Sequence, residues 1–248
     1  KVKDKKVGNK MKKLLSVLLT IAMVACVVAG FAGCSKSNGG DAESSSSSSE
    51  STSAKTVADL DKVKDANKLV IGITDYEPID YKDKDGKWIG FDADLARAVA
   101  EKMGIDVEFV VIDWERKFIE LNSGTIDCIW NGMTVSDSVK TNCDISDAYA
   151  GNSQVVVMKE DALSKYADAD AIKNANLTIA VEKGSAGETE AKKLSSNVVS
   201  LSAQSDALKE VKAGTADACI IDSTMANSMT KDGTDFADLG YSVSLTTE

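Results

Sequence analysis

The sequence predicts an α/β protein whose folded part consists of two similar units, and two observations support this. First, apolar runs typical of buried strands alternate with amphipathic helical patterns between residues 68 and 222. Second, the segment ELNSGTIDCIWNGMT, which starts at Glu120, recurs in outline as EVKAGTADACIIDST, which starts at Glu210. Each copy has the pattern of a helix end, a glycine turn and a short strand. Duplication is one interpretation, and chance likeness of two common connections is the other.

The N-terminal segment has the pattern of an export signal. Lysines at positions 12 and 13 precede an apolar run over residues 14–30, and small residues precede Cys34. The tetrapeptide FAGC, which ends at Cys34, resembles the bacterial lipobox, in which the cysteine is acylated and becomes the first residue of the mature chain. We therefore interpret residues 1–33 as an upstream extension plus a lipoprotein signal peptide. A single transmembrane anchor is the alternative, because the run approaches the thickness of a bilayer.

The segment after the signal is predicted to be a disordered tether. Residues 34–55 are rich in serine and acidic side chains and nearly lack large apolar groups. Such a segment cannot bury enough surface to offset the entropy lost on ordering. The folded part is therefore expected to begin at residue 56.

Composition excludes several functions. The chain has 29 basic and 39 acidic residues, and seven of the basic but one of the acidic residues precede Cys34. The remainder carries 22 basic and 38 acidic residues, a net charge of −16, which repels the phosphates of nucleic acids. There is no histidine, so nucleophile systems and metal sites that need histidine are excluded. No CxxC spacing is present, and no cofactor or metal is predicted.

Each unit is expected to contain three strands and two helices in alternation. The first unit has strands at 68–74, 105–112 and 127–132, with helices at 91–103 and 115–124. The second has strands at 177–182, 198–201 and 218–222, with helices at 187–196 and 205–214. Strands linked by helices are parallel, and ligands bind beyond their carboxyl ends. The segments to inspect are therefore 74–78, 112–116, 130–134, 182–187 and 221–224.

Several ordered motifs identify a family resemblance. The segments YEPIDYKDKDGKWIGFDADLARAVAEKMG, GTIDCIWNGMTVS, VEKGSAGE and ADACIID are similar to those of the family 3 extracellular solute-binding proteins. The resemblance implies a two-lobe periplasmic-binding-protein-like fold of type II, in which crossing hinge strands join two mainly parallel sheets flanked by helices. It places lobe 1 at 56–153, a hinge strand at 154–159, lobe 2 at 160–241 and the start of a return to lobe 1 at 242–248. Because the family adds a further strand and helix there, the sequence looks truncated.

The resemblance also implies ligand-binding residues in the first lobe. Tyr76 matches an aromatic residue that stacks on the ligand, and Trp114 matches a wall of the site, although core packing is the alternative for both. Asn131, Gly132 and Thr134 match the turn that holds the ligand α-carboxylate through backbone N–H groups and a hydroxyl.

In the second lobe, Asp222 matches the acid that binds the α-ammonium group, and Ser185 matches a hydroxyl contact at a helix start. A helix cap is the alternative for Asp222. The sequence departs from the family at Val139, where an arginine usually binds the ligand carboxylate. Arg116 is a candidate substitute, with a solvated position at a helix start as its alternative.

The resulting prediction is a solute-binding protein that captures an amino acid or a close relative between two lobes and delivers it to an ABC importer. The expected partners are the small molecule, a transporter permease and the membrane, reached through the lipid anchor on the extracellular or periplasmic side. A monomer without enzymatic activity is expected. The alternatives are a dehydratase-like enzyme, with Glu77, Asp80 or Asp222 as acid or base, and a ligand-sensing module on the same fold.

Overall fold

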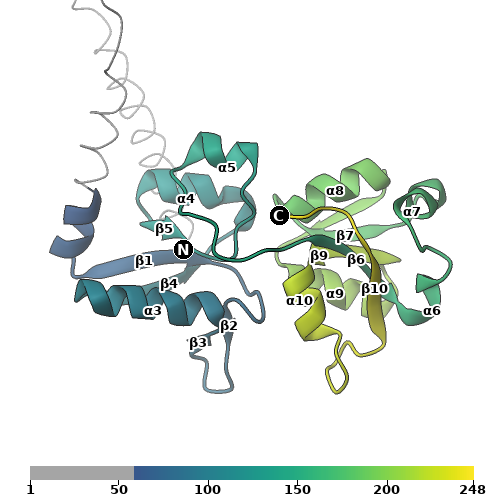
Figure 1. Ribbon diagram of the computed structural model, residues 1–248, viewed down its shortest axis with the longest axis horizontal. Coiled ribbons are helices and arrows are strands. Elements are labelled where there is room, and N and C mark those ends of the chain that lie inside the picture. The colour runs from purple at the N-terminus through teal and green to yellow at the C-terminus, as the bar shows by residue number, and fades with distance from the viewer. Residues whose placement is uncertain (1–58) are drawn as a thin grey trace, which may run out of the picture. The chain divides into compact units, whose positions relative to one another are not determined.

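The computed structural model describes residues 59–248 (Figure 1). The predicted signal peptide, Cys34 and the predicted tether lie outside this range. Residues 59–65 are helical and lead into the first strand. Among the described residues, no helix combines the length and the apolar character needed to cross a membrane.

The first lobe is built on a parallel sheet of three strands in the order β4-β1-β5. These strands are β1 (Lys68–Ile73), β4 (Asp106–Val111) and β5 (Cys128–Ile129). Ile71 and Ile73 in the central strand are fully buried. Burial of such a side chain contributes about 1.5–3 kcal/mol, so β1 forms the core of this lobe.

Helices cover both faces of the first sheet (Figure 1). On one face lies α3 (Phe91–Met103), which buries Ala93, Ala96 and Ala100 and ends at Gly104 in the left-handed conformation. On the other face lie a 3-10 turn, η1 (Trp114–Arg116), and α4 (Lys117–Ser123). Three smaller elements complete the lobe: β2 (Tyr81–Lys82), β3 (Trp88–Ile89) and α5 (Asp137–Asn142).

The second lobe is built on five strands in the order β10-β6-β9-β7-β8. β7 runs parallel to β8 and β9, whereas β6 runs antiparallel to β9 and β10. All residues of β7 and β9 are buried, because helices cover both faces of the sheet. The strands are β6 (Gln154–Lys159), β7 (Ile179–Glu182), β8 (Val198–Leu201), β9 (Ala218–Asp222) and β10 (Leu239–Ser244).

The helices of the second lobe form two apolar layers. One layer joins Val157 of β6 to Leu208 and Met225 of α9 and α10, and the other joins Ile172 and Ala191 of α7 and α8 to the opposite face. Figure 1 shows α8 on one side of the sheet and α9 on the other. The helices are α6 (Glu160–Leu163), α7 (Ala169–Ala175), α8 (Ala186–Leu194), α9 (Gln204–Ala213) and α10 (Ser223–Met229).

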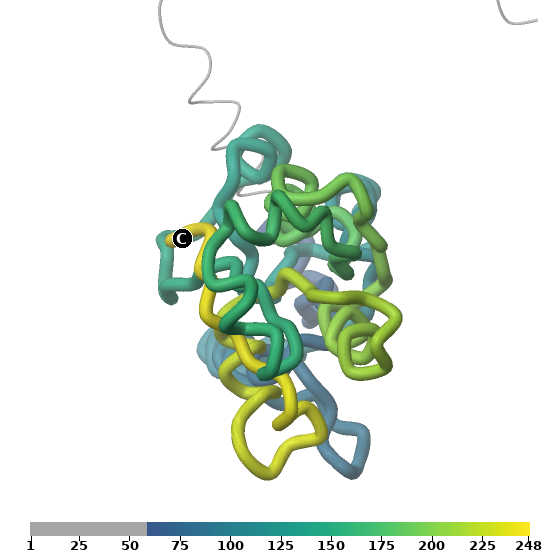
Figure 2. The backbone as a smooth tube through the Cα atoms, turned by 90° about the vertical axis from the view of Figure 1, so that its right-hand side faces the viewer, coloured from purple at the N-terminus to yellow at the C-terminus, as the bar shows by residue number. Residues whose placement is uncertain are grey.

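The segment that connects the two lobes lies beside residues 245–248. The N–H group of Leu245 donates to the carbonyl of Gln154 at 2.8 Å, and Glu248 and Asn152 exchange backbone hydrogen bonds of 2.8 and 3.1 Å. Figure 2 shows the last strand, in yellow, against the second lobe. The strand predicted as a hinge, 154–159, is β6 and pairs within the second sheet, and the connection lies just before it. β10 also extends past residue 241, where the second lobe was expected to end.

Candidate functional site

A cavity of about 210 Å³ lies where strand ends of the two lobes face each other. Carboxyl ends of parallel strands point their following residues to one edge of each sheet, so polar groups from both lobes converge there. The first lobe contributes Trp114, Lys117, Phe118, Asn131, Gly132, Met133, Thr134, Ser136, Ser138 and Val139. The second contributes Gln154, Glu182, Gly184, Ser185, Ala186, Glu188, Thr189, Gln204 and Asp222.

Six of the seven residues predicted for ligand binding line this cavity, but Tyr76 does not. The Tyr76 ring packs against Gly132 in the turn after β5: a Cβ atom added to Gly132 would lie 3.2 Å from the ring. Its hydroxyl is hydrogen-bonded to Thr224 of the second lobe, and the side chain is 3% exposed. In this structure Tyr76 therefore packs between the lobes, as in the alternative considered for it, and not on the cavity surface.

Asp222 ends β9 and faces the cavity as a carboxylate held by amides. Its oxygens accept hydrogen bonds from the side chains of Asn152, Gln154 and Gln204, with a distance of 2.7 Å from Gln154. It makes no side-chain cap for α10, although it stands at the N-cap position. Burial raises the pKa of Asp222, and the three amide donors oppose that shift. Because neutral donors orient the carboxylate without neutralising it, it can still bind a cation.

The turn after β5 is fixed by bonds within the first lobe. The Asn131 side chain accepts from the Thr74 N–H group at 3.0 Å and donates to the Thr74 hydroxyl at 2.9 Å. The Gly132 N–H group donates to Asp92 at 2.7 Å, so it is not free for the carboxylate contact expected of it. Within the described residues, the N–H groups of Met133 and Thr134 have no acceptor. These two N–H groups belong to residues that line the cavity and are free to donate to a ligand.

Ser185 begins α8 at the opposite wall. Its hydroxyl accepts from the Glu188 N–H group at 3.1 Å, and the Glu188 carboxylate accepts from the Gly184 N–H group at 2.9 Å. This is a variant of the capping box, which satisfies donors at a helix start. The Ser185 hydroxyl hydrogen stays available to a ligand acceptor, because the cap uses only the oxygen.

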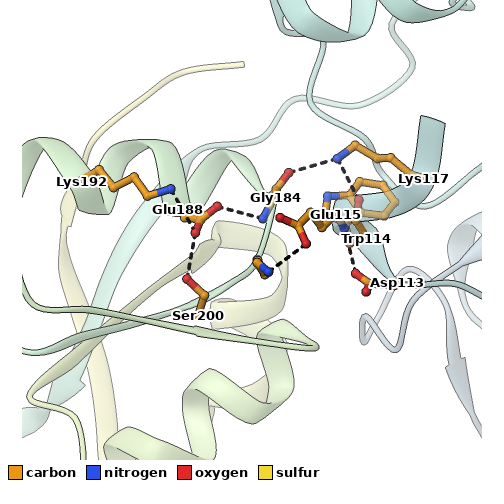
Figure 3. A network of polar contacts seen from close by, with 9 residues as sticks. Asp113, Trp114, Glu115, Lys117, Gly184, Glu188, Lys192 and Ser200 are labelled. Carbon is orange, nitrogen blue, oxygen red and sulfur yellow. Dashed lines mark hydrogen bonds and ion pairs between the residues drawn. The ribbon is translucent and has the colours of Figure 1, made fainter. Parts of the chain in front are cut away.

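Among residues 59–248, Lys117 is the one basic side chain in the cavity wall. Its ammonium group donates to the carbonyls of Trp114 and Gly184, each at 3.0 Å, and lies 4.7 Å from the centre of the Trp114 ring (Figure 3). Burial lowers the pKa of Lys117, and the nearby carboxyl of Glu182 opposes that shift. Gly184 belongs to the second lobe, so this contact joins the two lobes.

The candidate Arg116 is exposed and does not line the cavity. Asp113 caps the 3-10 turn by accepting from the Glu115 N–H group at 3.1 Å, and this turn sets which side chain faces inward. Val139, at the position where the family usually has arginine, is buried and lines the cavity. The positive charge in the cavity wall is therefore that of Lys117 in α4, which follows the sequence candidate Arg116 by one residue.

The sequence profile of the bacterial extracellular solute-binding proteins, family 3, matches residues 69–237. The chain belongs to this family. The predicted resemblance and the two-lobe type II fold are thereby confirmed, and the matched range covers both lobes.

Relatives of this family 3 protein have names that state amino acids. It is 29% identical over 230 residues to the arginine-binding extracellular protein ArtP of Bacillus subtilis, which covers 91% of this chain and 78% of that protein. It is 29% identical over 230 residues to a glutamine-binding protein of Geobacillus stearothermophilus, covering 90% and 86%. The solved structure of holo ArgBP from T. maritima matches with a TM-score of 0.70 and 30% identity, covering 76% of this chain and 82% of that chain.

One similar structure is connected with enzymatic activity. An ancestral amino acid-binding protein, described as a precursor of cyclohexadienyl dehydratase, matches with a TM-score of 0.70 and 31% identity over 76% of this chain and 82% of that chain.

Lys117 and Glu182 are among the cavity residues of this family 3 protein that sequence reasoning missed as site residues. Lys117 follows Trp114 by three residues, a spacing that places both on one helical face, and this signal could have identified it. Glu182 ends β7 and lies in the segment 182–187, but nothing in the sequence indicates that its carboxyl group is buried. The structure shows it 2% exposed, and burial together with the Asp222 charge raises the pKa of Glu182 to about 8, against the opposing charge of Lys117.

Proposed function

We propose that this protein binds an α-amino acid in the cavity between its lobes. The observation that carries the proposal is the Asp222 carboxylate, which faces the cavity and is oriented by three neutral amides. An α-ammonium group is the natural occupant of such an acceptor, since charge-assisted hydrogen bonds are stronger than neutral ones. The names of the relatives support an amino acid as the ligand class.

The ligand α-carboxylate would be held by the first lobe. The Met133 and Thr134 N–H groups and the Lys117 ammonium group are donors in the cavity wall, and Lys117 retains one N–H after its two carbonyl contacts. The Ser185 hydroxyl would add a contact from the second lobe. Binding would therefore hold the lobes together, because each end of the zwitterion contacts a different lobe.

The test is calorimetry of the full chain in mild detergent against the twenty common amino acids and ornithine. We expect at least one L-amino acid to bind with a micromolar or lower Kd, at about one ligand per chain. A folded sample that binds none of them would contradict the proposal.

We further propose that the protein is a monomer anchored by lipid at Cys34, with residues 1–33 removed and residues 34–55 acting as a tether on the extracellular or periplasmic side. The sequence pattern before Cys34 supports this. In a bacterial host, the unmodified chain should fractionate with membranes, whereas Cys34→Ala should leave the membrane fraction or keep its signal. If the two proteins fractionate alike, and the peptide that contains Cys34 shows no added mass of a lipid, the proposed anchor is contradicted. Light scattering measures the oligomeric state.

We propose that the captured amino acid is delivered to an ABC importer. The class of the relatives supports this role, and the proposed anchor would keep the protein near a permease. In the bacterium that encodes the chain, deletion should lower uptake of the bound amino acid at micromolar concentration, and a plasmid copy should restore it. Unchanged uptake would contradict delivery.

Binding without turnover is the last part of the proposal. Of the three carboxyl groups considered as acid or base, only Asp222 lines the cavity: Glu77 accepts from Ser228 at 3.2 Å and Asp80 is completely buried. Because a similar structure is described as a dehydratase precursor, cyclohexadienyl compounds and the bound amino acid should be incubated with the chain and followed by mass spectrometry. A product formed above the rate without protein would contradict binding alone.

A further inference from the structure

Glu182 is the cavity carboxyl that the proposed function leaves without a role. It stands at the end of β7, is 2% exposed, and lines the cavity between the lobes. Its enclosed Oε1 atom has no hydrogen-bond partner within the described residues. Buried polar atoms are almost always paired, so an unpaired carboxyl oxygen in a cavity wall points to a partner supplied by a ligand.

The surroundings of Glu182 contain more acid than base. The negative charges of Asp222 on β9 and Asp113 before η1 disfavour the ionised form of Glu182. The positive charge of Lys117 on α4 and the Thr74 hydroxyl after β1, a hydrogen-bond donor, favour it. Lys117 does not form an ion pair with Glu182, because its ammonium group is held by two carbonyls. The cation therefore compensates Glu182 only through space.

The other two acids in the cavity wall, Glu188 and Asp222, already have hydrogen-bond donors. Glu188 accepts from the Gly184 N–H group at 2.9 Å and the Ser200 hydroxyl at 2.8 Å, and it pairs with Lys192 at 3.1 Å (Figure 3). Asp222 has three amide donors and is assigned above to the ligand α-ammonium. Glu182 alone has a carboxyl oxygen that requires a donor from the cavity.

We propose that Glu182 is the subsite for the ligand side chain and that the ligand is an amino acid with a cationic side chain. This inference rests on the proposed function, which supplies the contacts to the α-ammonium and α-carboxylate groups. A side-chain cation supplies both the missing hydrogen-bond donor and the missing positive charge. A neutral amide supplies a donor only, and the Glu182 carboxyl then keeps its proton.

Ligand entry should change the protonation of Glu182. Because burial and the Asp222 charge raise its pKa to about 8, the carboxyl holds a proton at pH 7 in the empty cavity. A ligand cation beside it favours the ionised form, so the proton leaves for the buffer while the carboxylate pairs with the cation. A ligand with an apolar side chain gives no such release.

The experiment measures proton release by calorimetry of the full chain at pH 7 in buffers of low and high ionisation enthalpy. The ligands are arginine, lysine, glutamine and leucine, and the variants are Glu182→Gln and Glu160→Gln. The latter removes one exposed charge from the same lobe outside the cavity wall. We expect a cationic ligand to release close to one proton from the wild type and from Glu160→Gln, and far less from Glu182→Gln.

The affinities give a second readout. Glu182→Gln should weaken the cationic ligand by at least tenfold relative to Glu160→Gln, and should leave a neutral ligand unchanged or tighter. Cationic ligands that bind without proton release, or that bind Glu182→Gln as tightly as the wild type, would overturn the inference and leave amino-acid binding intact. Exclusive binding of a neutral amino acid would do the same. A panel with no binder would instead contradict the proposed function itself, and this inference with it. Proton release from the wild type tests the inference even if Glu182→Gln fails to fold.

Discussion

Lys117 and Gly184 join the two lobes beside the cavity: the Lys117 ammonium group donates to the Gly184 carbonyl at 3.0 Å. Gly184 has φ +74, and a Cβ atom on it would lie 2.8 Å from Glu115 Cα. The close approach of the lobes at this point therefore depends on a residue without a side chain. A second contact nearby, 2.9 Å between Lys183 and Glu115, is exposed and contributes little.

Gly184→Ala should weaken ligand binding, because the added methyl group meets the backbone of Glu115 when the lobes are close. Gly214 is the matched control, since it has φ +75 and no atom within 4 Å of an added Cβ. Both variants should lose about 1–2 kcal/mol of unfolding free energy through backbone strain, as measured by denaturant titration. Only Gly184→Ala should lose affinity, by roughly tenfold or more. Equal Kd values for the two variants would show that the contact does not govern closure.

Lys117→Met should lower affinity for the bound amino acid by about tenfold or more, because it removes the cation from the cavity wall. Its unfolding free energy should change little, since a buried ammonium group is costly and methionine fills a similar volume. Arg116→Met is the control, and it also tests the candidate chosen from the sequence. Calorimetry and thermal melting separate the two effects. A larger loss of affinity in Arg116→Met than in Lys117→Met would contradict the assignment.

Asp222→Asn should weaken binding of any amino acid by roughly 10- to 150-fold, the equivalent of losing a hydrogen bond to a charged group. The side chain keeps its size, but the new NH₂ group replaces an oxygen that accepted a hydrogen bond. It then faces an amide NH₂ donor, and neither group can accept. Thermal melting reports the cost of that mismatch, and calorimetry reports the affinity. The exposed Asp161→Asn controls for the lost charge. Unchanged affinity in a folded Asp222→Asn protein would remove the basis of the proposed site.

Asp80→Asn should alter how stability depends on pH. Burial and the Asp92 charge raise the pKa of Asp80 from 3.8 to about 8, against the opposing charge of Arg97. Between these values the folded state holds a proton that the unfolded state has lost, so the Asp80 contribution to the unfolding free energy falls with pH by about 1.4 kcal/mol per unit.

Denaturant titrations at pH 5, 6, 7 and 8 measure this dependence. The unfolding free energy should fall less steeply with pH in Asp80→Asn than in the wild type. The difference in unfolding free energy in favour of the variant should therefore grow toward pH 8. Asp85→Asn, in the exposed turn between β2 and β3, is the control. Parallel curves for wild type and Asp80→Asn would contradict the raised pKa.

Much of the fold follows from local pattern. The helix predicted at 91–103 matches α3 at both ends, because its small apolar residues recur at helical spacing and Gly104 can adopt the left-handed conformation that ends it. The strand predicted at 154–159 matches β6 for a similar reason, a run of buried β-branched residues. Short elements such as β2, β3 and α5 were missed, since two to six residues carry too little periodicity to stand out.

The sequence by itself determined the family, the α/β alternation and the strand ends from which polar residues converge, because these depend on patterns along neighbouring residues. Only the tertiary structure decided which side chains face the cavity. It places Lys117 in the cavity wall and Arg116 outside it. Tyr76 packs between the lobes, and Glu182 is buried in the same wall as Asp222. Burial and electrostatic environment arise from groups that are distant in the chain, and no local pattern contains them.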